Sequence, residues 1–263
     1  MKRKLLTTTR VIMLGFFLGA MLGSLLLYLP VSLRQGVHIK YMDALFVSVS
    51  GICVTGLSTV NIGATFSWFG QFVLLLLIQM GGLGIVTFTT LVLVAFQKRI
   101  TLADRMLMQN AYNLDTLSGL VGMTLRIVRA TISIELIGTL LYAIVFVPQY
   151  GAAGIWYALF HAVSAFCNAG IDLLGGNSLC AYRDNIWINL TTMFLIVAGG
   201  LGFPVYWELA RCFRIRRKKK TGESRMSFHA RLVIVVTVIL LAAGTLLTLI
   251  LEYDNPQTLG KLS

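Results

Sequence analysis

Long runs of apolar residues alternate with short polar segments along this chain. Five of the runs approach or exceed the roughly 20 helical residues needed to cross about 30 Å of hydrocarbon. We therefore predict an all-α integral membrane protein with five transmembrane helices. The predicted spans are Val11–Leu29, Phe69–Phe96, Leu120–Val147, Ile186–Ala210 and Leu232–Leu251.

Two further apolar runs are too short to span a membrane. They cover Tyr41–Ile52 and Ile155–Phe166, and each would be about 18 Å long as a helix at 1.5 Å per residue. Apolar segments of this length are typical of re-entrant or buried helices. Both fall between two full spans, and each runs into a short glycine-containing stretch. We therefore predict two re-entrant half-helices.

Composition and charge support this interpretation and orient the chain. Hydrophobic residues make up 57% and charged residues 12% of the sequence, against about 45–50% and 25% in soluble domains. The net charge is +12, and 18 of the 22 Lys and Arg residues fall on one side of the predicted spans. The positive-inside rule then predicts a cytoplasmic N-terminus in the cell membrane. The four basic residues on the outer side are Arg34, Lys40, Arg183 and Lys261.

The two halves of the chain repeat each other. Ala44–Leu57 aligns with Ala158–Ile171 at an offset of 114 residues, with seven of fourteen positions identical, and Gly81–Gly84 aligns with Gly199–Gly202 at an offset of 118. The repeated unit is a helix, a half-helix, a glycine-containing loop and a second helix. We predict repeats at residues 1–97 and 119–210, cytoplasmic loops at 98–118 and 211–230, and the first helix of an incomplete third repeat at 231–263.

The repeated loops, 54–58 and 168–172, are the candidate site. Irregular backbone at membrane depth is tolerated only inside protein or beside a water-filled cavity. Glycine reaches positive φ cheaply and can turn carbonyls to one side, and a ring of carbonyls can replace the hydration shell of a cation. The alternative is a structural turn that ends a buried helix.

These loops, with Gln79–Gly84 and Glu135–Gly138, resemble the TrkH/KtrB/HKT family of potassium transporters, and KtrB in particular. The resemblance implies uptake of K⁺, with Na⁺ as a second candidate ion, through a selectivity filter in which Gly56 and Gly170 are the signature glycines. Asp172 is a candidate for the outer mouth or for fixing the loop. The implied ion-binding residues are Val54, Thr55, Gly56, Leu57, Asn168, Ala169, Gly170 and Ile171.

The resemblance also implies a homodimer in lipid with a cytoplasmic nucleotide-binding regulatory subunit of the KtrA or TrkA type. No bound cofactor, metal site other than for permeating K⁺, nucleic-acid partner or enzyme activity is expected. Family members have four filter loops and this chain has two, so we expect it to form no selective pore by itself. It is either a fragment or completed by another chain, and a non-conducting scaffold or assembly subunit is the alternative function.

Several other residues have two interpretations. Glu135, near the middle of a span, is either functional or bonded to a polar group on a neighbouring helix. His161 is expected to pack, and Cys53 and Cys167 to serve as small packing residues. The glycine clusters at 81–84 and 199–202 are expected to allow close helix contact. Asp43 and Asp184 are expected to be caps or solvated loop residues.

Overall fold

The computed structural model of the protein describes residues 8–84, 87–91, 106, 120–175, 178–217 and 226–255. The named elements of this part are all helical, and they form two compact units, residues 1–200 and 201–263. The predicted all-α class is therefore confirmed. The first unit contains α1 (Thr8–Tyr28), η1 (Pro30–Ser32), α2 (Tyr41–Cys53), α3 (Ile62–Thr65), α4 (Trp68–Leu83), α7 (Leu120–Tyr150), α8 (Ala152–Phe166), η2 (Ser178–Tyr182) and α9 (Ile186–Leu201).

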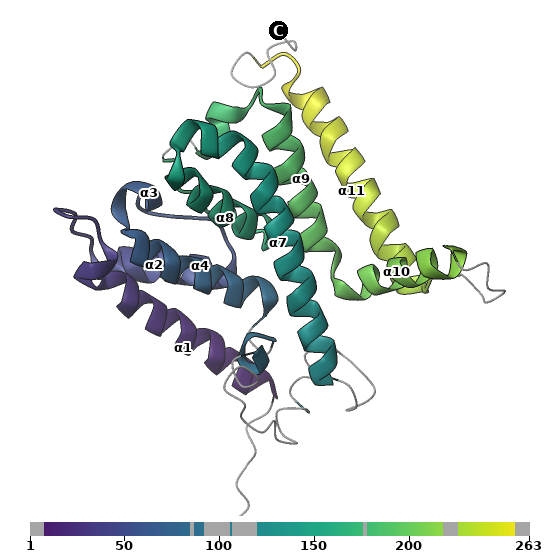
Figure 1. Ribbon diagram of the computed structural model, residues 1–263, viewed down its shortest axis with the longest axis horizontal. Coiled ribbons are helices and arrows are strands. Elements are labelled where there is room, and N and C mark those ends of the chain that lie inside the picture. Colours follow the sequence, from purple (N-terminus) through teal and green to yellow (C-terminus); the bar gives the residue numbers. More distant parts are fainter. Residues whose placement is uncertain are drawn as a thin grey trace, which may run out of the picture. The chain divides into compact units, whose positions relative to one another are not determined.

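Helices α1, α2 and α4 pack against one another (Figure 1). Small residues allow the close approach: a Cβ on Gly23 would meet the Ser48 hydroxyl at 2.5 Å, and one on Gly51 would meet Leu74 at 2.8 Å. The Ser48 hydroxyl donates to the Ala20 carbonyl at 2.7 Å. Helix α2 is thus packed between the longer helices α1 and α4.

In the rest of the first unit, α7 packs against α8, and α9 touches both. Gly138 of α7 lies against Leu195 of α9, and the hydroxyls of Tyr142 and Thr192 are 2.7 Å apart. The two halves of the first unit meet where α4 packs against α8 (Figure 1). There the Trp156 indole nitrogen donates to the side chain of Gln71 at 2.7 Å.

The structure breaks the helix within two predicted spans. Helix α4 ends at Leu83 and α9 ends at Leu201, short of Phe96 and Ala210. Residues 87–91 and Phe203–Arg217 are helical again, and residues 92–96 lie outside the described residues. The residues that follow α4 and α9, Gly84 and Gly202, have φ of +80° and +78°, a conformation that ends a helix and that glycine adopts most easily. Each helix has 16 residues, which corresponds to about 24 Å.

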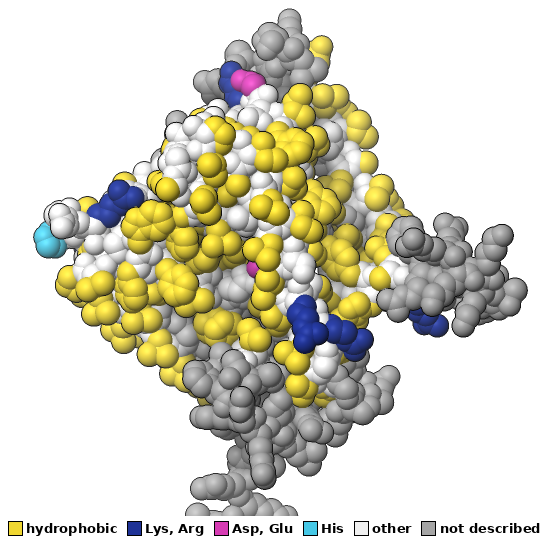
Figure 2. Space-filling view, in the orientation of Figure 1, with side chains coloured by type: hydrophobic (Ala, Val, Ile, Leu, Met, Phe, Trp, Pro, Cys, Tyr) yellow, Lys and Arg dark blue, Asp and Glu magenta, His cyan; other side chains and the backbone are white. Residues whose placement is uncertain are grey.

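Three of the described helices are long and apolar enough to cross a membrane, or four if α9 and α10 together form one broken span. They are α1 from Arg10 onward, α7 and α11. Large hydrophobic side chains remain exposed on all three, and Figure 2 shows that such side chains dominate the visible face. This surface is typical of an integral membrane protein.

The second unit consists of α10 (Phe203–Arg217) and α11 (Phe228–Glu252), which pack together. Ser227 caps α11 by accepting from the Ala230 N–H, and its own N–H donates to Glu208 of α10 at 2.7 Å. Because α10 continues to Arg217, the first part of the predicted 211–230 loop is helical. The rest of that loop up to residue 225 and nearly all of the predicted 98–118 loop lie outside the described residues.

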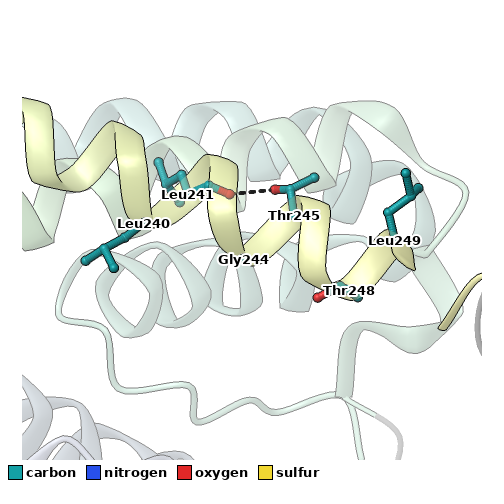
Figure 3. Close-up of a pocket in the computed structure, with 6 residues that line it drawn as sticks. All are labelled: Leu240, Leu241, Gly244, Thr245, Thr248 and Leu249. Atoms are coloured by element: carbon teal, nitrogen blue, oxygen red, sulfur yellow. Dashed lines mark hydrogen bonds between the residues drawn. The ribbon is translucent and has the colours of Figure 1, made fainter. Parts of the chain in front are cut away.

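Helix α11 carries a groove along its own surface (Figure 3). The Thr245 hydroxyl donates to the Leu241 carbonyl of the same helix at 2.8 Å, so it satisfies its hydrogen bond without a partner from another segment. The groove is apolar and holds no charged side chain. Its lining residues are Leu240, Leu241, Gly244, Thr245, Thr248 and Leu249.

Candidate functional site

The two predicted loops have positive φ at equivalent positions. Val54 and Gly56 have φ of +57° and +76° in the first loop, and Asn168 and Gly170 have φ of +58° and +66° in the second. Left-handed residues therefore alternate with others at the same positions of both repeats. Such alternation turns neighbouring peptide groups toward one side instead of to opposite sides as in a strand.

The N–H groups of both loops point back to the half-helix that precedes them. In the first loop the Thr55 N–H donates to the Ser50 carbonyl at 3.0 Å. In the second loop the Ala169 N–H donates to the Ser164 carbonyl at 2.8 Å, and the Asn168 N–H donates to the Ala165 carbonyl at 3.1 Å. The C-terminal carbonyls of α2 and α8 are thus used to hold the loops.

Several carbonyl groups of the two loops receive no hydrogen bond from the described residues. Among the described residues, no donor reaches the carbonyl oxygens of residues 54–56 or 168–170. Of these six residues only Ala169 is buried, and none of the six carbonyl oxygens is committed to a protein donor in the described part of the chain. A dehydrated cation is a partner that carbonyl oxygens can satisfy.

The two loops lie against each other. A Cβ built on Gly56 would be 2.6 Å from the Ala169 carbonyl oxygen, and one built on Gly170 would be 3.7 Å from the Gly56 Cα. Glycine therefore has two reasons to occupy position 56, its positive φ and this close approach. Two segments that are 114 residues apart in sequence present their glycines to the same place.

A serine in the last turn of each half-helix fastens the loop beyond its glycine. The Ser50 hydroxyl oxygen accepts from the Leu57 N–H at 3.0 Å, and the Ser164 hydroxyl oxygen accepts from the Ile171 N–H at 3.0 Å. The Ser164 hydroxyl also donates to the Ile171 carbonyl at 2.6 Å. The sequence analysis missed these residues as site residues, although both are serine at the 114-residue offset.

The glycine clusters bring each loop close to its following helix. A Cβ on Gly81 would overlap the Ile52 carbonyl oxygen, and a Cβ on Gly199 would overlap the Phe166 carbonyl oxygen. Ile52 and Phe166 occupy equivalent positions in the two half-helices. The prediction of close helix contact is therefore confirmed, and the contact is made with the ends of the half-helices.

Glu135 bonds to a neighbouring helix across the two halves. The Gln79 side-chain nitrogen donates to Glu135 Oε1 at 2.9 Å, and the Gln79 oxygen accepts a weak bond from the Cys167 thiol at 3.8 Å. Cys167 also fills the space beside Gly82, where a Cβ would overlap its sulfur. Of the two interpretations, the bond between helices is observed for Glu135. The packing role predicted for Cys167 is also observed, whereas Cys53 is exposed.

The predicted acidic residues act locally. Asp172 Oδ1 accepts from the Leu174 N–H at 2.9 Å, which fixes the turn after the second loop. Ser58, at the equivalent position of the first repeat, accepts from the Val60 N–H at 3.2 Å. Asp43 accepts from the Lys40 N–H at the start of α2 and so acts as a capping residue.

Two remaining predictions concern residues outside the loops. Asp184 pairs with Arg183 at 3.4 Å, and both side chains are exposed to solvent. His161 is buried and packs against the rings of Tyr142, Phe146 and Phe160, as predicted.

Comparison with known proteins identifies relatives over almost the whole chain. The family model named TrkH, cation transport protein, matches residues 18–254. The Ktr system potassium uptake protein B of Bacillus subtilis is 42% identical over 97% of the chain, and the potassium/sodium uptake protein NtpJ of Enterococcus hirae is 38% identical over 98%. The Ktr system potassium uptake protein B of Vibrio alginolyticus is 36% identical over 97%. The chain covers 54–55% of the length of these three relatives.

Proposed function

Because the chain belongs to the TrkH family of cation transport proteins, we propose that it forms part of a potassium path across the cell membrane. The loops at 54–57 and 168–171 supply backbone carbonyls that bind the ion as it passes. This is a transport function and involves no catalysis by the chain. Sodium is a second candidate ion, since one relative is named a potassium/sodium uptake protein.

The observation that supports the proposal best is the set of six loop carbonyls with no donor among the described residues. They belong to two loops that touch at Gly56 and Gly170. The negative ends of the α2 and α8 helix dipoles face the same loops, which favours a cation. A structural turn that only ended a helix would not need the same alternation of φ in both repeats.

The proposal includes an arrangement in the membrane. Helices α2 and α8 are re-entrant half-helices, the repeats are 1–97 and 119–210, and α11 opens a third repeat. The N-terminus lies in the cytoplasm, on the same side as most Lys and Arg residues. Two loops surround only part of an ion, so further loops complete the ring. The assembly is a homodimer with a nucleotide-binding regulatory subunit on its cytoplasmic face.

The test is substitution of the two glycines in a transporter that conducts. A suitable protein is a chimaera in which this chain replaces the matching half of the Bacillus subtilis Ktr system protein B. We expect Gly56→Ala and Gly170→Ala each to lower the preference for K⁺ over Na⁺ or to lower uptake, by roughly ten-fold or more. A Cβ is strained at positive φ, at a cost of about 1–2 kcal/mol, and at position 56 it also meets the Ala169 carbonyl.

The matched control is Gly36→Ala. Gly36 has φ of +79°, but a Cβ there would meet no atom within 4 Å, so the same backbone strain arises away from the loops. Uptake and ion preference are expected to be unchanged in this variant. Unchanged potassium uptake and ion preference in both loop variants would contradict the proposal and leave the scaffold function as the better explanation.

A further inference from the structure

A cavity of about 170 Å³ lies beside the second loop, between α7, α8 and α9. Its lining includes Tyr142, His161, Ser164, Asp172 and Thr192, so polar groups face it from all three helices and from the loop. A cavity needs a volume of about 10–15 Å³ to hold one water molecule. The cavity is therefore large enough and polar enough to hold several waters.

His161 lines this cavity and has a buried nitrogen without a partner in the described part of the chain. Only 3% of the residue is exposed, and among the described residues its Nε2 has no hydrogen-bond partner. Its Nδ1 lies 2.7 Å from the Tyr157 carbonyl oxygen. Because a carbonyl only accepts, Nδ1 carries the proton, and in a neutral imidazole Nε2 is then an acceptor. The nitrogen that faces away from the backbone of α8 therefore requires a donor.

The hydroxyl groups around the cavity donate elsewhere. Thr192 donates to the Ile188 carbonyl at 2.8 Å, which leaves the Tyr142 hydroxyl as the donor in the bond between Tyr142 and Thr192. The Ser164 hydroxyl donates to the Ile171 carbonyl. Asp172 contributes acceptor oxygens, and one of them is held by the Leu174 N–H. Ser178 and Asn168, which also line the cavity, carry the remaining donors, and neither is bonded to Nε2.

We propose that this cavity is a hydration site in which an ordered water donates to His161 Nε2 and, with its second hydrogen, to an acceptor of the cavity wall such as the Asp172 carboxylate. The water links α8 to the loop that α8 carries. A buried water typically makes about three hydrogen bonds to polar groups that would otherwise be unsatisfied, and this site offers both the space and the partners.

The site distinguishes the second repeat from the first. The residue equivalent to His161 is Val47, a fully buried apolar residue of α2. At this position α8 therefore carries a polar side chain that can bind water, whereas α2 carries an apolar one that cannot. The consequence for ion passage rests on the proposed function, whereas the hydration of the cavity does not.

The test uses the 263-residue chain labelled with ¹⁵N-histidine and reconstituted in lipid bilayers. The chain has three histidines. His38 and His229 are exposed and serve as references. The signals that disappear in His161→Val belong to His161. Solid-state NMR should show His161 with a protonated Nδ1 and a non-protonated Nε2 that receives magnetisation from water protons. A protonated Nε2, or a non-protonated Nε2 with no transfer from water, would overturn the proposal.

A second measurement asks whether the water braces the loop. Hydrogen exchange of the amides at 168–171 should be about 2- to 10-fold faster in His161→Val, as expected for the loss of one hydrogen bond. His161→Gln keeps an acceptor in the cavity and should restore slower exchange. Equal exchange in wild type and both variants would exclude the bracing role. Because neither measurement involves transport, failure here and failure of the proposed function are distinguishable.

Discussion

Ser50 and Ser164 occupy the same position in the two repeats, and their hydroxyl oxygens receive the N–H groups of Leu57 and Ile171. Each bond spans seven residues and encloses the glycine of its loop. The serine side chain of the half-helix therefore fixes the direction of the loop after its glycine. Neither serine needs to touch an ion to control where the carbonyls point.

We predict that Ser164→Ala is more damaging than Ser50→Ala. Removing a hydroxyl that satisfies a buried backbone group costs about 1–3 kcal/mol, and both bonds of Ser164 to Ile171 are buried whereas those of Ser50 are partly exposed. The free energy of unfolding of the reconstituted chain is the quantity to measure. Ser58→Ala, at an exposed turn, is the control and should lower the free energy of unfolding by less than either variant. A larger decrease in Ser50→Ala than in Ser164→Ala would refute the ranking.

Sequence reasoning found the glycines of the site but not the side chains that hold them. Gly56 and Gly170 stand out because glycine has few reasons to recur at one offset inside apolar segments. A serine in an apolar helix is typical of simple packing, so Ser50 and Ser164 carry no signal until the loop folds back onto them. The polar partner expected for Glu135 could not be identified as Gln79 for a similar reason, because Gln79 is distant in sequence from both Glu135 and Cys167.

At the scale of the elements, the clusters at 81–84 and 199–202 have two functions. Their first glycine allows the helix to touch the end of a half-helix, and their last glycine ends the helix through its positive φ. Hydropathy alone predicts the apolar residues on both sides of Gly84 as one span. The break depends on the conformation of one residue, which an average over a long window does not detect.

We predict that Gly81→Ala and Gly199→Ala destabilise the protein by at least about 1–3 kcal/mol, the usual cost of overpacking. In both cases the new Cβ would overlap a backbone carbonyl oxygen, which cannot move aside as a side chain can. The measurement is again the free energy of unfolding, supplemented by the amount of folded protein recovered from membranes.

Two helical glycines serve as controls for this prediction. Gly122 and Gly244 lie in α7 and α11, and a Cβ on either would meet no atom within 4 Å. Replacing them by alanine should be neutral or stabilising by up to about 1 kcal/mol, since alanine favours helix. If Gly81→Ala and Gly199→Ala behaved like these controls, the close contact with the half-helices would be wrong.

At the scale of the whole molecule, the exposed apolar surface indicates a lipid environment (Figure 2), and the distribution of charge predicts the orientation. The native Cys180 is free and exposed in the segment that we place outside. A membrane-impermeant maleimide should therefore label Cys180 on intact cells. In a background in which all four native cysteines are replaced by serine, Lys219→Cys, in the basic segment that we place inside, should be labelled only after the membrane is opened. Labelling of Lys219→Cys from outside intact cells would reverse the predicted topology.

The presence of both loops in one polypeptide has a consequence for how the protein can change during evolution. In an assembly of identical subunits, one codon alters every wall of the ion path at once. Here Val47 and His161 hold equivalent positions with different chemistry, because each repeat mutates independently. In the proposed ion path, one wall can keep the geometry that the ion requires while the other acquires a new property, so duplication within the chain allows such a path to be adjusted one side at a time.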